Sequence, residues 1–316
     1  MPRFSKILTS FSFSLIFFFA AFQIFAFPNF DFDGKADFAV FRPTERTWYS
    51  LSSELKTFSA VTWGAANDRP VPADYDGDGL TDEAVYRNGN WFIRKSSNGE
   101  MFSVKWGGTT QTEGGYTYDE PVPADFDGDG TADIAVFRPA DGVWYILQSS
   151  NGFSQNYPLI FKWGKLGDIP VPADYDGDGR TDFAVFRYTE TRWYIQESRT
   201  KSLRTATFGR LGVDRLVPND YTGDGKAEIA VYRDGQWIFI RSEDNKIEYQ
   251  NFGSAYDKPV PADYDNDGII DFAVFRNGDW FVLKSSDGAF SSIKFGQNGD
   301  VPLAFLDTRP SIVGVP

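Results

Sequence analysis

A phrase of nine residues recurs six times along the chain and constrains its fold more than any other feature of the sequence. In its fullest form the phrase reads Asp-Tyr-Asp-Gly-Asp-Gly-Arg-Thr-Asp at residues 174–182, and Phe-Ala-Val-Phe-Arg follows at 183–187. The copies begin at Asn29, Asp74, Asp125, Asp174, Asp220 and Asp263, with spacings of 45, 51, 49, 46 and 43 residues. A period of this size predicts a protein in which each copy contributes one unit of supersecondary structure.

Each unit holds four short apolar segments that are separated by Gly, Asn, Asp and Pro, and none of them sustains a helical period. In order they are Val-Pro-Ala, Phe-Ala-Val-Phe, Trp-Tyr-Ile and a stretch that ends in an aromatic-Gly pair. Four short strands in about 45 residues are typical of one blade of a β-propeller. We therefore predict an all-β fold, a single six-bladed β-propeller of four-stranded blades over residues 27–316. The aromatic-Gly pairs are Trp63-Gly64, Trp106-Gly107, Trp163-Gly164, Phe208-Gly209, Phe252-Gly253 and Phe295-Gly296.

The two ends of the chain predict that the ring is closed. The first unit lacks the strand that precedes the Asp-rich loop in the other units, whereas Asp300-Val-Pro-Leu-Ala-Phe-Leu306 has the sequence of that strand. Residues 301–306 are therefore expected to complete the blade begun by residues 29–64. The alternative, an open array, leaves one blade a strand short and exposes a sheet edge.

The Asp-rich loops have the carboxylate spacing of a metal site. Carboxylates at positions 1, 3, 5 and 9, with Gly at position 6, surround one point with hard oxygen ligands, which suits calcium. Without a cation these carboxylates repel one another, so an acidic turn with no ion is the weaker interpretation. Position 12 is Val in all six copies, where an EF-hand loop carries a bidentate Glu, so the loops are not EF-hands.

Four loops are complete and two deviate, which predicts four strong calcium sites and two weaker ones. The first loop has Asn29 at position 1, and the fifth has Thr222 at position 3 and Glu228 at position 9. In loop order the candidate ligands are Asn29, Asp31, Asp33 and Asp37; Asp74, Asp76, Asp78 and Asp82; Asp125, Asp127, Asp129 and Asp133; Asp174, Asp176, Asp178 and Asp182; Asp220, Thr222, Asp224 and Glu228; Asp263, Asp265, Asp267 and Asp271. Position 7 varies, as expected if it contributes only a backbone carbonyl, and is Lys35, Leu80, Thr131, Arg180, Lys226 and Ile269.

These loops, the aromatic-Gly pairs and the period resemble the FG-GAP repeats of integrin α-chain propellers, and they closely resemble the repeats of secreted bacterial FG-GAP/VCBS proteins. The resemblance covers residues 29–306. It departs from the family pattern in two ways: Phe41-Arg-Pro43 and Phe137-Arg-Pro139 stand nearest to the missing Gly-Ala-Pro, and integrin propellers have seven blades. The resemblance implies calcium in the loops and a ligand-binding role toward glycans or proteins.

Two further sets of residues recur at fixed positions. All nine Trp fall on repeat positions, which favours core packing over a stacking platform for ligands. An Arg ends the second strand of every unit, and an Asp recurs in each connection between blades. We predict that these residues form six ion pairs on the rim opposite the metal loops, and the alternative is an anion-binding ring of arginines. They are Arg42, Arg87, Arg138, Arg187, Arg233 and Arg276, with Asp68, Asp119, Asp168, Asp214, Asp257 and Asp300.

One insertion breaks the repeat and is the candidate for ligand specificity. Residues 108–118 lengthen the connection between Gly107 and Asp119, and they offer Tyr116, Tyr118 and several hydroxyl groups on the rim away from the metal loops. Loops on rigid folds often carry binding, although an insertion without function is equally consistent with the sequence. A smaller insertion, residues 151–159, falls on the rim of the metal loops.

The first 26 residues predict targeting rather than folding. Arg3 and Lys6 precede an apolar, Phe-rich stretch from Ile7 to Phe25, and Ala26 stands at a cleavage point. This is typical of an export signal, and the alternative is an uncleaved N-terminal membrane anchor. Both place the remaining chain outside the cytoplasm, secreted or at the cell surface.

Composition narrows the function. The chain has no His and no Cys, which excludes a Ser-His or Cys-His nucleophile, the usual zinc and haem sites, and disulfides. A net charge of −13 argues against binding to nucleic acid, and half of the 44 acidic residues lie in the six loops. We expect a monomeric calcium-binding module, not an enzyme, that binds an extracellular glycan or protein.

Two alternatives stay open at this stage. One is a polysaccharide hydrolase or lyase that uses carboxylates as acid and base. The other is a structural component of the cell surface or matrix. The acids outside the repeated positions show no common grouping that would form a catalytic pair. They are Glu54, Glu100, Glu113, Glu190, Glu243 and Glu248.

Overall fold

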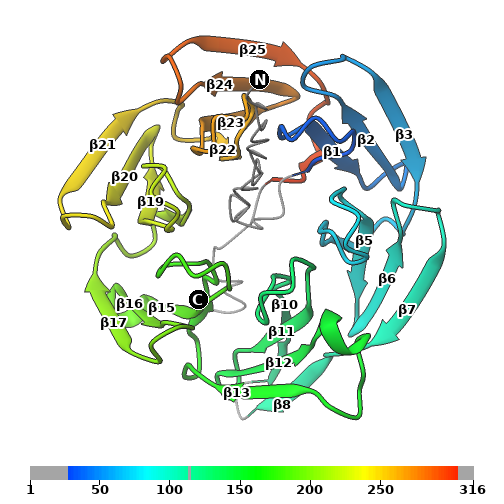
Figure 1. The fold of residues 1–316 in the computed structure, drawn as a ribbon, viewed down its shortest axis with the longest axis vertical. Helices are drawn as coiled ribbons and strands as arrows, with labels where there is room; N and C mark the ends of the chain where they lie inside the picture. The colour runs from blue at the N-terminus through cyan, green and yellow to red at the C-terminus, as the bar shows by residue number, and fades with distance from the viewer. Residues whose placement is uncertain (1–27, 113–114, 305–316) are drawn as a thin grey trace, which may run out of the picture.

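The computed structural model describes residues 28–112 and 115–304, apart from the side chains at 112–116, as six four-stranded antiparallel sheets in a ring (Figure 1). This confirms the predicted six-bladed β-propeller. Within these residues, helical structure is limited to two 3-10 turns, η1 (Ser149–Asn151) and η2 (Tyr188–Glu190). No described helix is long and apolar enough to cross a membrane. The predicted export signal, residues 1–26, lies outside the described residues.

The blades follow one another in chain order. Within each blade the four strands lie side by side, with the first in the order given below nearest the centre of the ring and the last at its outer edge (Figure 1). The first three blades are β26 (Val301–Pro302), β1 (Phe38–Arg42), β2 (Thr47–Leu51) and β3 (Phe58–Thr62); β4 (Arg69–Pro70), β5 (Glu83–Arg87), β6 (Asn90–Arg94) and β7 (Met101–Lys105); and β10 (Glu120–Pro121), β11 (Ile134–Arg138), β12 (Val143–Leu147) and β13 (Leu159–Lys162).

The last three blades are β14 (Ile169–Pro170), β15 (Phe183–Arg187), β16 (Arg192–Gln196) and β17 (Leu203–Thr207); β18 (Arg215–Leu216), β19 (Ile229–Arg233), β20 (Gln236–Ile240) and β21 (Ile247–Asn251); and β22 (Lys258–Pro259), β23 (Phe272–Arg276), β24 (Asp279–Leu283) and β25 (Phe290–Lys294). The insertion forms a separate hairpin of β8 (Thr109–Thr112) and β9 (Gly115–Tyr118). The innermost strand has two residues and lies just before the predicted Val-Pro-Ala segment, as Ile169–Pro170 does in the fourth blade. Within the predicted segment only Ala173 forms a β-bridge, an isolated one to Asp182, because Pro172 has no N–H with which to continue the ladder.

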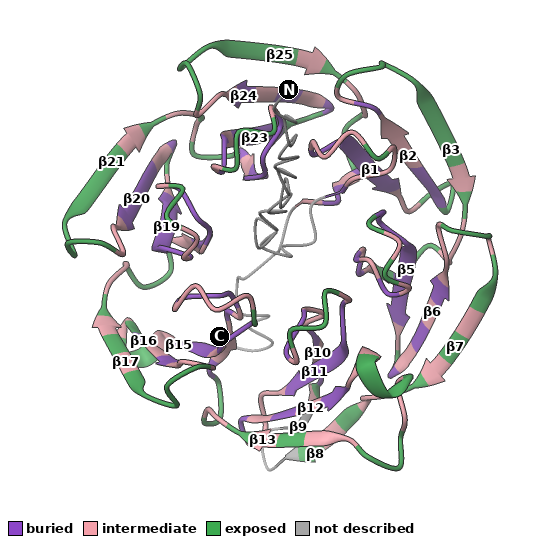
Figure 2. Ribbon diagram, in the orientation of Figure 1, coloured by how far each residue is buried: buried purple, intermediate pink, exposed green. Residues whose placement is uncertain are grey.

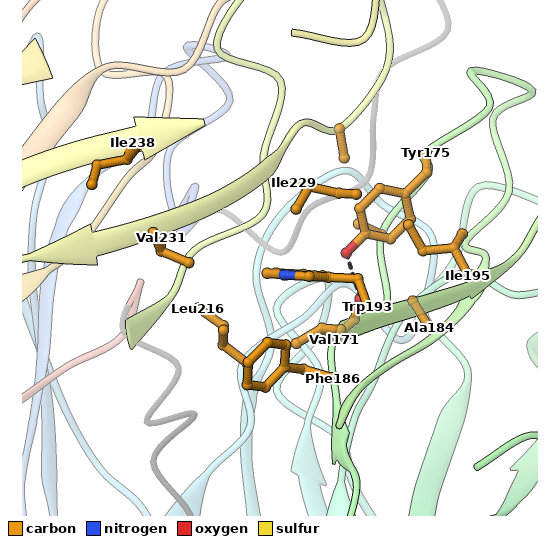
Figure 3. Packing of buried hydrophobic residues seen from close by; sticks show 12 residues of the cluster. Val171, Tyr175, Ala184, Phe186, Trp193, Ile195, Leu216, Ile229, Val231 and Ile238 are labelled. Atoms are coloured by element: carbon orange, nitrogen blue, oxygen red, sulfur yellow. Dashed lines mark hydrogen bonds between the residues drawn. The ribbon is translucent and has the colours of Figure 1, made fainter. Parts of the chain in front are cut away.

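The second strand of each blade is buried on both faces, as its uninterrupted apolar sequence predicts (Figure 2). In β15, Ala184 belongs to a core shared with the fifth blade, and Val185 belongs to a core shared with the third. Six such cores lie one between each pair of neighbouring blades. Figure 3 shows the core between the fourth and fifth blades, where the Tyr175 hydroxyl donates to the Val171 carbonyl at 2.8 Å. The hydrophobic stabilisation therefore resides between blades.

The ring closes through both ends of the described chain, as the sequence predicts. β26 pairs with β1, with Val301 opposite Phe41 and Pro302 opposite Val40. The Leu303 N–H also donates to the Ala39 carbonyl at 2.9 Å. The sixth and first blades share a buried core around Trp280, so the closure is packed as well as hydrogen-bonded. Residues 305 and 306, predicted to continue this strand, lie outside the described residues.

The six tryptophans of the third strands are core residues, which confirms the packing interpretation for them. Each is at most 3% exposed and donates its indole N–H to the carbonyl of the aromatic residue in the aromatic-Gly pair. In the fourth blade, Trp193 Nε1 lies 3.1 Å from the Phe208 carbonyl. This bond fixes the corner where the chain leaves one blade for the next. The six residues are Trp48, Trp91, Trp144, Trp193, Trp237 and Trp280.

The predicted Arg-Asp pairs form in all six blades. In the fourth blade, Arg187 donates through Nε and Nη2 to the two oxygens of Asp168, at 2.9 and 2.8 Å. Asp168 also accepts the Lys165 N–H at 2.9 Å, so one carboxylate holds both the strand end and the connection from the third blade. The carboxylates of these pairs are nearly inaccessible to solvent. An anion-binding ring is not supported, because the arginines already have bidentate partners.

Removing an arginine from this set should destabilise the ring. Arg187→Ala leaves the Asp168 carboxylate, whose side chain is 1% exposed, without its cationic partner. We expect the free energy of unfolding, measured in guanidinium chloride, to fall by about 3 kcal/mol. Arg192→Ala, an exposed arginine of the next strand, is the matched control and should change the free energy by about 0.5 kcal/mol or less. Equal effects of the two substitutions would contradict the structural role.

Candidate metal centres

Each Asp-rich loop leads into the second strand of its blade and curls around its own carboxylates, and in the second to sixth blades it connects that strand to the first. In the fourth blade, the position-1 residue Asp174 accepts the N–H groups of Gly177 and Gly179 at 2.6 and 2.8 Å. The turn requires a left-handed backbone at position 6, where Gly179 has a φ of +83°. These bonds explain why the loop begins with Asp and bends at Gly.

The position-9 carboxylate lies at the base of the loop. Asp182 is fully buried and accepts the N–H groups of Tyr175 and Ser198 at 2.9 and 2.5 Å. Its burial, together with the charge of nearby Asp176, raises the pKa of Asp182 to about 7. The same desolvation raises the pKa of Asp133 and of Glu228 to about 7. Bare charge is therefore costly at the base of these loops.

The position-3 carboxylates carry the clearest sign of a missing partner. Asp176 accepts the Arg199 N–H at one oxygen, while its other oxygen, Oδ1, is buried and has no hydrogen-bond partner within the described chain. Asp31, Asp76 and Asp265 each have one oxygen in the same condition. A buried carboxylate oxygen without a donor is expensive unless a cation lies against it.

Several of the predicted ligands converge in space. In each of the first five loops, one oxygen from each of three acidic residues lies within 4.8 Å of the other two, and the described chain contains a sixth such group. In the fourth loop these residues are Asp174, Asp176 and Asp182. Oxygen-only donor sets of this kind suit a hard divalent cation. The loops could therefore hold metal ions, and the unpartnered oxygens fit that interpretation.

The two deviating loops differ from each other. In the fifth loop, the Thr222 hydroxyl donates to Glu228 at 3.1 Å, so position 3 is satisfied within the protein. In the first loop, Asn29 replaces only the turn-forming carboxylate, and Asp31 retains its unpartnered oxygen. The sequence predicts that both loops are weaker, and the hydrogen bonds indicate that the fifth has the smaller need for an ion.

The structure assigns a role to serines that the sequence analysis overlooked. One serine in each blade donates its backbone N–H to the position-9 carboxylate and its hydroxyl to the position-5 carboxylate. The signal was present, since a serine stands 14 or 16 residues after position 9 in every unit. The six are Ser53, Ser96, Ser149, Ser198, Ser242 and Ser285.

The metal-ligand role of the position-7 carbonyl stays a prediction. The carbonyls of Thr131 and Ile269 lie 3.4 Å from the hydroxyls of Ser149 and Ser285, beside the position-5 carboxylates. The side chains also pack, which the sequence did not predict. Arg180 lies so close to Gly128 of the preceding loop that a Cβ there would come within 2.7 Å of its Cγ.

Backbone hydrogen bonds link the six loops into a circle. The carbonyl at position 1 of each loop accepts the N–H at position 8 of the next loop around the ring. Whatever orders one loop therefore also orders its neighbour. The pairs, acceptor first, are Asn29 and Thr81 (2.8 Å), Asp74 and Ala132 (2.7 Å), Asp125 and Thr181 (2.7 Å), Asp174 and Ala227 (2.7 Å), Asp220 and Ile270 (3.0 Å), and Asp263 and Ala36 (2.7 Å).

The insertion lies on the opposite rim, away from the metal loops. Tyr118, at the end of β9, is 61% exposed and lines a cleft between the second and third blades. The side chain of Tyr116, the other candidate ligand residue, lies outside the described part of the chain.

Fold and loops together define a β-propeller in which each blade carries one Asp-rich loop that could hold a cation. The FG-GAP-like repeat model matches residues 74–136, 125–185 and 174–231, which together span half of the chain. The chain belongs to the FG-GAP-like repeat family. This confirms the resemblance drawn from the loops and the aromatic-Gly pairs.

Solved structures share the fold at low sequence identity. A lectin from Agrocybe aegerita, described for specific recognition of non-reducing terminal N-acetylglucosamine, matches with a TM-score of 0.53 and 11% identity over 84% of this chain and 92% of the lectin. TolB from Acinetobacter baumannii matches with a TM-score of 0.56 and 12% identity over 84% of this chain and 66% of TolB. A search of curated proteins finds no match. At these identities the structures establish the propeller architecture alone.

The buried carboxylates predict an unusual pH dependence for the ion-free protein. An acid whose pKa rises on folding binds its proton more tightly in the folded state, so stability is lost as pH rises from the ordinary pKa near 4 to the raised value. For Asp133, Asp182 and Glu228 the raised value is about 7. In a chelator, we expect a lower melting temperature at about pH 8 than at about pH 5.5, and a divalent cation should reduce the difference. Thermal melts at both pH values, with and without cation, measure this, and a higher melting temperature at pH 8 in chelator would contradict it.

Proposed function

We propose that the chain is an exported, calcium-stabilised propeller that binds an extracellular glycan or protein and performs no chemistry. The observation that carries the calcium assignment is the buried, unpartnered oxygen at position 3 of four loops. The carboxylates at positions 1, 3, 5 and 9, with the carbonyl at position 7, would hold the ion. Calcium would neutralise the clustered charge and thereby stabilise the circle of loops.

Four strong and two weaker calcium sites remain the proposed stoichiometry. The first and fifth loops are the weaker sites, because each has three carboxylates where the other loops have four. Asn29 takes the place of the position-1 carboxylate in the first loop, and Thr222 takes the place of the position-3 carboxylate in the fifth. Export through residues 1–26 is part of the proposal, and it would place the loops in calcium-rich surroundings.

The absence of catalysis is proposed because five of the six acids outside the repeated positions have ion-pair partners, and the side chain of the sixth, Glu113, lies outside the described residues. Glu54 pairs with Lys35, Glu190 pairs with Arg187, and Glu243 and Glu248 both pair with Arg241. A glycosidase would require two carboxyl groups facing one substrate, separated by about 5–9 Å. These ion pairs lie in the first, fourth and fifth blades, and the two carboxylates that share the fifth blade are both engaged by Arg241, which supports a binding module over a hydrolase or lyase.

Calcium titration tests the metal assignment. We expect at least four calcium ions per chain by metal analysis and calorimetry, and about 2.7 kcal/mol of stabilisation per site when free calcium is about 100 times its Kd. Asp176→Asn should remove one strong ion and lower the calcium-dependent gain in melting temperature. Asp287→Asn, an exposed aspartate outside the loops, is the matched control and should bind calcium as the parent does. Fewer than three bound ions would refute the proposal.

Ligand binding is tested on an array of glycans and extracellular matrix proteins, with calcium and with chelator. We expect retention of one class without turnover, and weaker retention in chelator because the ring loosens. The glycans should include terminal N-acetylglucosamine, the sugar recognised by the lectin of similar fold. Release of reducing ends from a bound polysaccharide would replace the proposal with the hydrolase or lyase, and binding to none of the probes would overturn it.

A further inference from the structure

The hairpin β8–β9 interrupts the sixfold pattern at one place, and a cleft of about 600 Å³ lies at its base. The cleft is lined by the connection into the second blade, the end of β5, and the residues from Tyr118 to Pro121 that enter the third blade. Its volume is within the range of small-ligand sites, which is about 300–1,000 Å³. The metal loops lie on the other rim, so the cleft is independent of them.

A buried hydroxyl in the wall of this cleft has no acceptor. Tyr86 is 8% exposed, and its hydroxyl donates to no group within the described chain, while the Gly108 N–H lies near its oxygen. The equivalent residue of the fifth blade, Tyr232, donates to the Ser254 carbonyl at 2.7 Å. The hairpin begins at Gly108, the counterpart of Ser254, and this is where the two blades differ. A buried hydroxyl without an acceptor is unfavourable, and a ligand oxygen would supply the missing acceptor.

The arginine beside this tyrosine is also incompletely used. Arg87 donates to Asp68 through Nε and Nη2, and its Nη1 makes no hydrogen bond within the described residues. Nη1 is likewise unbonded within the described residues in Arg138, Arg233 and Arg276, whereas Nη1 of Arg187 approaches Glu190 at 3.5 Å. The side chain of Arg87 is 41% exposed, compared with 11% for Arg187. Arg87 therefore presents two N–H groups to a ligand in the cleft.

The rest of the lining is polar without a large excess of charge. Asp68 and Glu120 are each paired with an arginine that also lines the cleft, and Asp119 is paired with Arg138 behind it. The side chain of Tyr118 stands exposed at the edge. Paired charges and amides suit the hydroxyl groups of a sugar, and an exposed aromatic ring suits the apolar face of a pyranose. A phosphate or sulfate would require unpaired cations.

We propose that this cleft binds pyranose units of a neutral oligosaccharide, with Tyr118 stacked on a sugar ring and with Tyr86 and Arg87 hydrogen-bonded to its hydroxyls. The inference rests on the proposed binding function and assigns it a ligand class and a place. The six-bladed ring supplies the rigid frame, and the hairpin supplies the asymmetry that makes one cleft unlike the others.

A second cleft, of about 380 Å³, occupies the equivalent position between the sixth and first blades. It has no hairpin, and Phe275 replaces Tyr86, although Tyr256 stands 93% exposed in its wall. It therefore offers an aromatic ring without the unpaired hydroxyl. This makes it an internal comparison for the first cleft.

The experiment is calorimetric titration of the calcium-loaded chain with cellotriose, mannotriose and triacetylchitotriose, and with trigalacturonate as the acidic comparison. Tyr86→Phe removes only the hydroxyl and introduces the residue that four other blades carry, at Phe41, Phe137, Phe186 and Phe275. We expect Tyr86→Phe and Tyr118→Ala each to weaken binding of the best neutral trisaccharide about tenfold, or about 1.4 kcal/mol. Tyr232→Phe and Tyr256→Ala are the matched controls, and they should bind that trisaccharide as the parent does.

The results separate this inference from the proposed function. Equal loss in Tyr256→Ala, or no loss in Tyr86→Phe and Tyr118→Ala, would place the sugar elsewhere and overturn the inference while the binding function stands. Preference for trigalacturonate would overturn the neutral ligand class. If the chain binds an extracellular protein but none of the trisaccharides, the cleft assignment is likewise refuted and the proposed function stays intact. Thermal melts of each variant confirm that lost binding is not lost folding, and Tyr86→Phe should melt no lower than the parent.

Discussion

The second strand of every blade has no polar face, and the rest of the structure depends on this constraint. Ala184 and Val185 are adjacent in sequence, yet they contribute to cores on opposite sides of their blade. A single blade has no core of its own and cannot satisfy such a strand alone. An open array would leave one apolar face exposed at each end, so closure of the ring removes both losses together. Val301 and Leu303 at the end of the chain thus complete the core around Trp48, which the first blade shares with the second, as well as a sheet.

Closure would also couple the proposed metal binding to the whole ring. The position-1 carbonyl of each loop is bonded to the next loop, and the last pair joins Asp263 to Ala36 across the seam of the chain. Loops that repel internally would strain this circle at six points, whereas loops neutralised by cations would reinforce it. The Arg-Asp pairs on the opposite rim have their counterions built into the protein and need no ligand. The two rims therefore fix the blades by different means. The Arg-Asp rim uses ion pairs within the protein, whereas the rim of Asp-rich loops would depend on the cation concentration of the solution.

Much of this was accessible from the sequence, because repetition turns weak local signals into a pattern. The blade number, the terminal closure and the Arg-Asp partners all follow from positions that recur six times. What the sequence did not reveal depends on contacts between strands whose separation varies. Ser198 meets Asp182 only because the intervening hairpin has a particular length, and Thr222 satisfies Glu228 only through the curl of its loop. The unpaired hydroxyl of Tyr86 is further from prediction, since Phe and Tyr are interchangeable in the apolar pattern of that strand.

A symmetrical ring distributes its stabilising contacts evenly, and a specific ligand requires a place where that evenness fails. The Asp-rich loops, the tryptophans and the Arg-Asp pairs recur in every blade, so a site built from them would be present six times. The hairpin of the second blade is a local departure that also changes the hydrogen bonding of its surroundings, as the comparison of Tyr86 with Tyr232 shows. Because six cores and six ion pairs hold the frame, one unsatisfied hydroxyl costs little of the total stability. The repeat thus permits a polar cleft that a smaller fold with one core could accommodate less easily.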